Sequence, residues 1–160
     1  MAGQVVILMG SPSDTEHVAA IVAGLEALGV AHNERVASAH KSVRHLLGIL
    51  EGYAAAEGPV VFIAVAGRSN ALAGMVDANT PWPVITCPPA STAYGGADIY
   101  SSLRMPSGVA PAVVLEPANA ALAAAKMLAL ADPALRARIG AYQREMTEGI
   151  LRADERLTGE

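Results

Sequence analysis

The sequence has a single cysteine and few charged residues. Lys, Arg, Asp and Glu make up 16% of its 160 residues, whereas globular chains average about 25%. One cysteine, Cys87, excludes an intramolecular disulfide and a cysteine-rich zinc site. The net charge is −4 and there is no run of Lys or Arg, which excludes a sequence-independent nucleic-acid binding protein. The shortage of charge indicates that much of the surface is buried in an oligomer.

Long apolar runs and targeting signals are also lacking. No stretch approaches the roughly 20 apolar residues of a membrane span, and the N-terminal residues MAGQ include neither the basic region nor the cleavage site of a signal peptide. We therefore expect a cytoplasmic protein with no membrane partner. A hydrophobic content of 52% excludes disorder. No His, Cys, Asp or Glu group has metal-ligand spacing, so we expect no metal.

Short apolar runs alternate with helical patterns along the whole chain. Strands are predicted at 5–9, 34–37, 60–66, 83–86 and 112–116, and helices after each of them. This alternation predicts a three-layer α/β/α, flavodoxin-like fold with a central parallel five-stranded sheet. Nothing divides the chain, so we expect one domain over 1–160.

The last 30 residues lie outside this repeat and predict a C-terminal helix. Asp132 and Pro133 suit the N-cap and the first helical position. The apolar stripe of this helix consists of Leu135, Ile139, Tyr142, Met146 and Ile150. We expect residues 132–160 to pack on a neighbouring subunit.

Ligands of parallel α/β sheets bind beyond the carboxyl ends of the strands. The loop after the first strand reads Gly10-Ser11-Pro12-Ser13-Asp14. Its hydroxyls and the free N–H groups of a helix start can hold a phosphate, and Asp14 could accept from ribose hydroxyls. Alternatively, Ser13 or Asp14 only caps the helix. The loop is neither a P-loop nor a G-x-G-x-x-G motif, so ATP and NAD are not indicated.

The loop after the second strand reads Ser38-Ala39-His40-Lys41. Histidine titrates near neutral pH and suits proton transfer, and Lys41 supplies a cation for a phosphate or carboxylate. The alternative is a surface histidine near a helix start. The other histidines, His17, His32 and His45, fall within helix or strand patterns, and we interpret them as structural or solvated.

The loop after the third strand reads Gly67-Arg68-Ser69-Asn70. A glycine there lets a ligand approach the backbone, and the side chains that follow can bind an anion. The alternative is a turn with an exposed arginine. Farther along, Arg104 could reach a phosphate or a partner subunit, or could belong to a loop that ends a helix. We interpret Cys87 as a buried small residue.

At these loops the sequence resembles the PurE family of purine biosynthesis. The match runs collinearly from about Val5 to Leu130. Five ordered motifs carry it: Met9-Gly10-Ser11-Pro12-Ser13-Asp14, Ser38-Ala39-His40-Lys41, Ala64-Val65-Ala66-Gly67-Arg68-Ser69-Asn70, Pro83-Val84-Ile85-Thr86-Cys87-Pro88-Pro89 and Ser101-Ser102-Leu103-Arg104-Met105-Pro106-Ser107-Gly108.

The family has two classes, and the motifs resemble the second. Mutases of the first class typically read Ser-Ala-His-Arg, Gly-Ala-Gly-Gly-Ala-Ala-His and Gln-Met-Pro-Gly-Gly. This chain has Lys41 in place of that Arg, Ala-Gly-Arg-Ser-Asn at 66–70 and Arg-Met-Pro-Ser-Gly at 104–108. These variants resemble the direct carboxylases, which include the carboxylase domain of the bifunctional animal enzyme.

The resemblance implies a phosphoribosylaminoimidazole carboxylase. Such an enzyme joins 5-aminoimidazole ribonucleotide (AIR) and CO2 to give 4-carboxy-5-aminoimidazole ribonucleotide (CAIR), reversibly and without cofactor, ATP, biotin or metal. His40 would be the acid–base. The implied substrate-binding residues are Ser11, Ser13, Asp14, Ser38 and Lys41 at the ribose phosphate, Gly67 and Ser69 beside the ring and CO2, and Arg68 nearby. Asn70 and Arg104, like Arg68, receive no fixed role.

The family also implies a homo-oligomer, an octamer or a tetramer. Two other functions stay open at this stage. One is the mutase activity of the first class, which rearranges the N5-carbamate of AIR. The other is a flavodoxin-like nucleotide-binding module without chemistry, which would not need His40.

Overall fold

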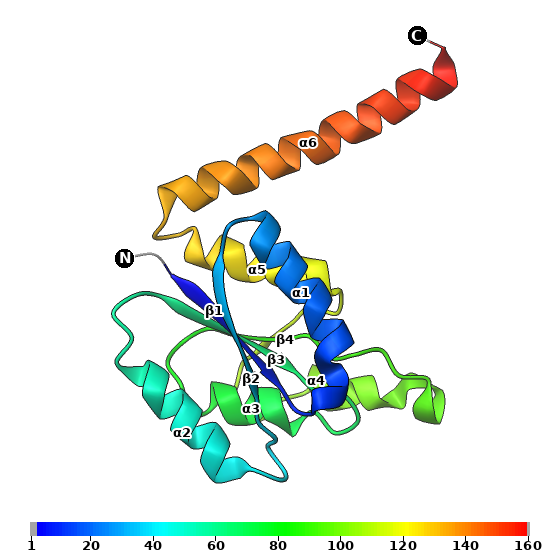
Figure 1. Cartoon of the computed structure of the whole chain (residues 1–160). Helices are drawn as coiled ribbons and strands as arrows, with labels where there is room; N and C mark the ends of the chain where they lie inside the picture. Colours follow the sequence, from blue (N-terminus) through cyan, green and yellow to red (C-terminus); the bar gives the residue numbers. More distant parts are fainter. Residues whose placement is uncertain (1–2, 160) are drawn as a thin grey trace.

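A five-stranded parallel sheet forms the centre of the computed structural model, which describes residues 3–159 (Figure 1). Met1, Ala2 and Glu160 lie outside the described residues. They are the ends of the domain expected over 1–160, and Met1 and Ala2 also begin the N-terminal stretch in which we expect no signal peptide. The strands are β1 (Gln4–Met9), β2 (Ala31–Val36), β3 (Val60–Val65), β4 (Val84–Thr86) and β5 (Ala112–Val113), in the spatial order β2-β1-β3-β4-β5. All neighbouring strands are parallel, which confirms the predicted fold class.

Helices cover both faces of the sheet. On one face, α1 (Thr15–Ala27) and α5 (Pro117–Leu128) pack on alternate strand residues such as Val5 and Ile7. On the other face, α2 (Val43–Ala54) and α3 (Ala71–Asp77) pack on the residues between them, such as Val6 and Leu8. Because successive side chains of a strand point to opposite faces, a strand between two helical layers is apolar throughout. This explains the continuous apolar runs of β1 and β3.

The fifth strand is shorter than the predicted 112–116. Val114 still donates its N–H to the carbonyl of Thr86 at 3.0 Å, but β4 ends at Thr86 and β5 has no further partner there. Prolines at 88 and 89 lack the N–H that a longer β4 would need. The β5 chain therefore leaves the sheet early.

The segment between β4 and β5, for which the alternating pattern predicts a helix, holds a 3₁₀ segment (Ala93–Ile99) followed by the short helix α4 (Tyr100–Leu103). Tyr94, Gly95 and Gly96 all have positive φ, between 50° and 81°. Two of these three are glycines, for which such a conformation carries no steric penalty.

The final helix, α6 (Pro133–Thr158), begins as predicted, because the Asp132 carboxylate accepts the N–H of Leu135 at 2.9 Å. Only Leu135 and Ile139 of its apolar stripe are buried. Farther along, α6 leaves the rest of the molecule (Figure 1), and Ile150 is 72% exposed. Within residues 3–159, no helix has both the length and the apolar content to cross a membrane.

Candidate functional site

Three loops meet beyond the carboxyl ends of β1, β2 and β3 and enclose a cleft of about 630 Å³. Because β1 lies between β2 and β3, the loops that follow these strands are brought side by side. Every residue for which the sequence predicts a catalytic or substrate-binding role lines this cleft: Ser11, Ser13, Asp14, Ser38, His40, Lys41, Gly67, Arg68 and Ser69. Their roles stay predictions, but the structure places them together.

The first loop turns through a short 3₁₀ segment (Pro12–Asp14) before α1 begins. Ser11 caps this segment, since its hydroxyl oxygen accepts the N–H of Ser13 at 3.3 Å and the hydroxyl of Ser13 at 2.9 Å. Asp14 stands at the N-cap of α1 but accepts no capping hydrogen bond. Thus neither the Ser13 nor the Asp14 side chain caps α1, and the Asp14 carboxylate lines the cleft without a capping hydrogen bond.

The environment of Asp14 disfavours its negative charge. Partial burial raises the pKa of this carboxyl above its ordinary value of 3.8, against the opposing effects of a Ser11 backbone hydrogen bond, His17 and Arg68. A buried acceptor gains from a donor brought by a ligand. Asp14 can therefore accept a hydrogen bond from a ligand in the cleft.

The second loop is a tight turn organised by Ser38. The Ser38 hydroxyl oxygen accepts the backbone N–H groups of His40 at 3.3 Å and Lys41 at 3.2 Å. Ser42 supports the turn by accepting the N–H of Ser38 at 2.9 Å. The side chains of His40 and Lys41 are exposed at the cleft. Such an imidazole can exchange protons with a ligand, and such an ammonium can meet an anion.

The third loop brings backbone close to the cleft at Gly67. A Cβ at this glycine would lie 3.8 Å from Cδ of Pro89, in ordinary contact, so the missing side chain leaves space for a ligand. Arg68, at a φ of 56°, follows in the left-handed region that non-glycine residues rarely adopt. The Ser101 hydroxyl connects this turn to the segment before α4: its oxygen accepts the N–H of Asn70 at 3.0 Å, and it lies 2.8 Å from the Asp98 carbonyl and 3.2 Å from that of Arg68.

Two residues without a predicted role lie in different surroundings. Asn70 is 2% exposed and lies beneath the cleft, bonded to Thr86 and Ser102. Its oxygen accepts the N–H of Ala73 at 3.4 Å and caps α3. Arg104 is exposed and does not line the cleft. Asn70 thus supports the third loop from within, whereas Arg104 is separate from the site in this chain.

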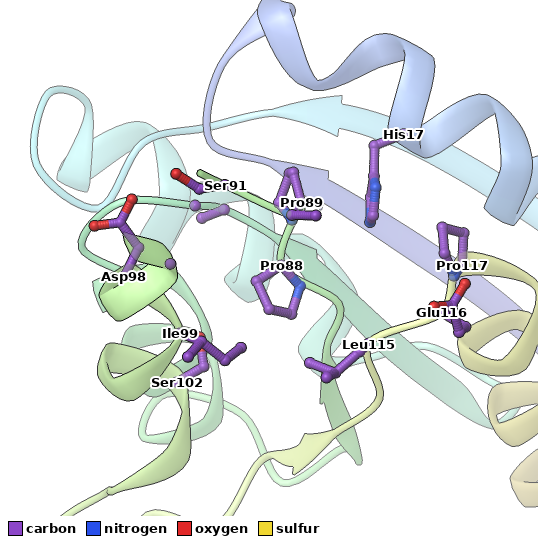
Figure 2. A pocket seen from close by; sticks show the side chains of 14 residues that line it. His17, Pro88, Pro89, Ser91, Asp98, Ile99, Ser102, Leu115, Glu116 and Pro117 are labelled. Carbon is purple, nitrogen blue, oxygen red and sulfur yellow. The ribbon is translucent and has the colours of Figure 1, made fainter. Parts of the chain in front are cut away.

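A second cavity of about 430 Å³ adjoins the cleft (Figure 2). The two share five lining residues: Ala66, Gly67, Pro89, Ala90 and Ser91. In Figure 2, His17 faces the cavity from one side and Asp98 and Ile99 from the other, with Pro88 and Pro89 between them.

His17 lines this second cavity, although the sequence predicts a structural or solvated side chain there. The sequence signal that could have indicated His17 is its place three residues after Asp14, because positions i and i+3 share one face of a helix.

Within 3–159, no group of three or more His, Cys, Asp or Glu side chains could hold a metal ion.

Comparisons with known proteins point to a single family. The family model described as AIR carboxylase matches residues 4–149. A phosphoribosylaminoimidazole carboxylase of Archaeoglobus fulgidus is 51% identical over 152 residues, which are 95% of this chain and 83% of that protein. A protein of the same name from Treponema denticola is 45% identical over 153 residues, 96% of each chain.

The fold agrees with a solved structure of this kind. The crystal structure of Treponema denticola PurE superposes with a TM-score of 0.95 at 44% identity, over 97% of this chain and 98% of that one. The family model spans most of the chain, and it includes all three loops of the cleft. The chain therefore belongs to the AIR carboxylase family, a family of enzymes.

Proposed function

We propose that this protein carboxylates AIR at C4 with CO2 to give CAIR in purine biosynthesis. The observation that carries the proposal is that His40, Lys41 and the loop 10–14 line one cleft in a member of the AIR carboxylase family. The reaction is reversible and uses no ATP, biotin or metal. Relatives named phosphoribosylaminoimidazole carboxylase support the substrate assignment.

The cleft offers separate groups for each part of the nucleotide. Ser11, Ser13 and Lys41 provide two hydroxyls and a cation for the phosphate, with the Ser38 hydroxyl hydrogen still free to donate. Asp14 accepts from the ribose hydroxyls. This leaves the imidazole ring beside Gly67 and Ser69, with Arg68 nearby, where the backbone approaches the cleft.

The chemistry requires one proton transfer at the ring. C4 of AIR is the nucleophilic carbon of an enamine, and it forms a bond to the carbon of CO2 while one C=O electron pair moves to oxygen. The adduct carries a proton on C4, which His40 removes as the ring regains aromaticity. AIR and CO2 thus give CAIR and one proton, and His40 returns that proton to C4 in the reverse direction.

The direct use of CO2 is the finer part of the proposal. Lys41 and the segments 66–70 and 104–108 match the carboxylase class in preference to the mutase class. The mutase activity is the second candidate, because both classes need a nucleotide cleft and a histidine. A binding module without chemistry would leave the exposed imidazole of His40 in the cleft unused.

We also propose that the single domain of 1–160 works as a homo-oligomer, an octamer or a tetramer, with α6 packed on a neighbouring subunit. Beyond Ile139 the apolar stripe of α6 is uncovered: Tyr142 is 39%, Met146 47% and Ile150 72% exposed. Exposed apolar stripes of this kind mark interaction surfaces.

An absorbance assay for CAIR tests the function directly. Purified protein receives either AIR with bicarbonate as the source of CO2, or N5-carboxyaminoimidazole ribonucleotide alone, both without ATP. Rapid product formation from AIR that rises with CO2 supports the carboxylase. Turnover of the N5-carbamate alone identifies a mutase, and no turnover of either substrate leaves the binding module.

A further inference from the structure

Two stretches of chain lie between the two cavities described above, Ala66 and Gly67 after β3 and a longer stretch after β4. Residues 88–91 follow β4, and three of them, Pro89, Ala90 and Ser91, line both the substrate cleft and the adjoining cavity. We call residues 88–91 the dividing wall. Any movement of this wall changes the shape of the cleft opposite Gly67, whose missing Cβ would have contacted Pro89.

The dividing wall has few anchors of its own. Pro88 and Pro89 have no N–H to donate, and within residues 3–159 no backbone–backbone hydrogen bond joins 88–91 to another part of the chain. The last such bond before it is made by Cys87, which donates its N–H to the carbonyl of Ala64 at 2.9 Å. The position of the wall therefore depends on how the Cys87 carbonyl, the last group before it, is held.

His17 contacts this carbonyl group. Its Nε2 lies 3.1 Å from the carbonyl oxygen of Cys87, the residue directly before the wall. A carbonyl oxygen can only accept, so Nε2 carries the proton and donates it. His17 is partly buried on α1, which packs firmly on the sheet through Val18 and Ile21. The bond thus ties the start of the wall to a rigid helix.

Cys87 extends this tie to the next strand. Its Sγ lies 3.4 Å from Nε2 of His17 and donates to the carbonyl oxygen of Leu115 at 3.6 Å. Burial, with a smaller effect of Glu116, raises the pKa of the Cys87 thiol to about 12, which keeps the sulfur protonated as this donation requires. Helix α1, the end of β4 and the chain after β5 are thereby joined at one point.

We propose that His17 is a positioning residue for the substrate cleft, acting through the Cys87 carbonyl on the dividing wall. It touches neither nucleotide nor CO2. Its bond holds Pro89–Ser91 at the distance from Gly67 that the bound nucleotide requires. The expected effect on the KM for AIR rests on the proposed function, whereas the expected effect on the position of the dividing wall does not.

Four variants test this role. His17→Leu removes the donor and keeps an apolar side chain of similar bulk. His17→Gln and His17→Asn are both amides, but only the longer Gln places its nitrogen where Nε2 of histidine lies. The exposed His45, on α2, gives the control His45→Asn.

Thiol labelling measures the wall without reference to activity. Cys87 is the only cysteine and is fully buried, so its labelling by a disulfide reagent at pH 8 reports opening of the structure around it. Loss of one hydrogen bond corresponds to labelling about five-fold faster in His17→Leu and His17→Asn. We expect His17→Gln and His45→Asn to label at the wild-type rate.

Steady-state kinetics with AIR measure the effect on the cleft. We expect the KM for AIR to rise about five-fold in His17→Leu and His17→Asn, with kcat within about two-fold of wild type, the pattern of lost uniform binding. His17→Gln restores KM. A merely structural role would lower the amount of active enzyme and leave KM unchanged.

The outcomes separate the two proposals. Wild-type labelling and KM in both His17→Leu and His17→Asn, or a His17→Gln enzyme as impaired as His17→Asn, overturns the role of His17. If the wild-type enzyme does not turn over AIR, the proposed function fails, yet the labelling rates still decide whether His17 holds the wall. If His17→Leu does not fold, the Gln and Asn pair carries the test.

Discussion

Asn70 donates its side-chain amide to the hydroxyl of Thr86 at 2.6 Å, in the interior beneath the cleft. The same nitrogen donates to the Ser102 hydroxyl at 2.9 Å. One buried side chain thus joins the loop after β3, the end of β4 and helix α4. Gly67 and Ser69, three and one residues earlier in the chain, owe their place at the cleft to this junction.

Asn70→Ala should therefore destabilise the protein clearly. It leaves the Thr86 and Ser102 hydroxyls with fewer partners and uncaps α3, at a cost of about 2–3 kcal/mol. For a chain of this length that corresponds to a fall in Tm of roughly 5–10 °C. Asn79→Ala is the matched control, since Asn79 is exposed and its side-chain amide donates to the Met75 carbonyl at 2.7 Å. Equal melting temperatures of the two variants would contradict the role given to Asn70.

Gly67→Ala tests the space that the third loop leaves open. The backbone at Gly67 is not left-handed, and the added Cβ meets only ordinary contact distances, so the variant should fold normally. A methyl group placed where the ligand packs costs about 1–3 kcal/mol of binding, so the KM for AIR should rise about ten-fold.

Gly48→Ala is the control for this substitution. Gly48 is exposed within α2, where nothing lies within 4 Å of an added Cβ. Alanine should stabilise that helix by up to about 1 kcal/mol and leave KM unchanged. A wild-type KM in Gly67→Ala would mean that the nucleotide does not approach this glycine.

The sequence predicts the sheet and the cleft well because both follow from local patterns. Continuous apolar runs mark β1 and β3, and polar side chains begin within three residues of the end of each. In a parallel sheet the carboxyl ends of the strands lie at one edge, so residues as distant in sequence as Ser11 and Ser69 line the same cleft. This holds because the chain returns to the same edge after every helix.

The contacts across the cleft wall depend on tertiary packing and have no such local signal. His17 falls within an ordinary helical pattern, and only the folded chain brings it to the Cys87 carbonyl, 70 residues away. Likewise, the early end of β5 depends on where β4 stops. The length of a strand is set by its partner as well as by its own sequence.

Asp14→Asn should stabilise the protein at neutral pH. Burial raises the pKa of Asp14, so the folded state keeps this proton to a higher pH than the unfolded state, whose value is near 3.8. In that window the folded state binds more protons, and its stability falls as the pH rises. Above the pKa of Asp14 in the folded state, burial of the negative charge lowers the free energy of unfolding by its full amount. The neutral amide of Asp14→Asn removes this destabilisation.

Urea unfolding of wild type and Asp14→Asn at pH 7 and pH 4 measures this effect. The variant's advantage should be larger at pH 7 and shrink toward pH 4, where the wild-type carboxyl takes up its proton. Glu16→Gln, which removes an exposed carboxylate from the first turn of α1, should show no comparable gain. A constant difference between wild type and Asp14→Asn at both pH values would mean that the Asp14 charge costs the fold nothing.

His40→Asn should abolish most turnover while leaving substrate binding intact. The amide occupies similar space at the exposed tip of the second loop, and the backbone bond to Ser38 does not involve the side chain. It cannot take the proton from C4, so kcat should fall by about 10²- to 10⁴-fold. The Kd for AIR, measured by calorimetry, should stay within about three-fold of wild type, since less than 1 kcal/mol of binding is lost. The control His45→Asn should keep both constants, because His45 lies on α2 outside the cleft. An unchanged kcat in His40→Asn would show that His40 does not remove the proton from C4. The base would then be one of the other groups that line the cleft.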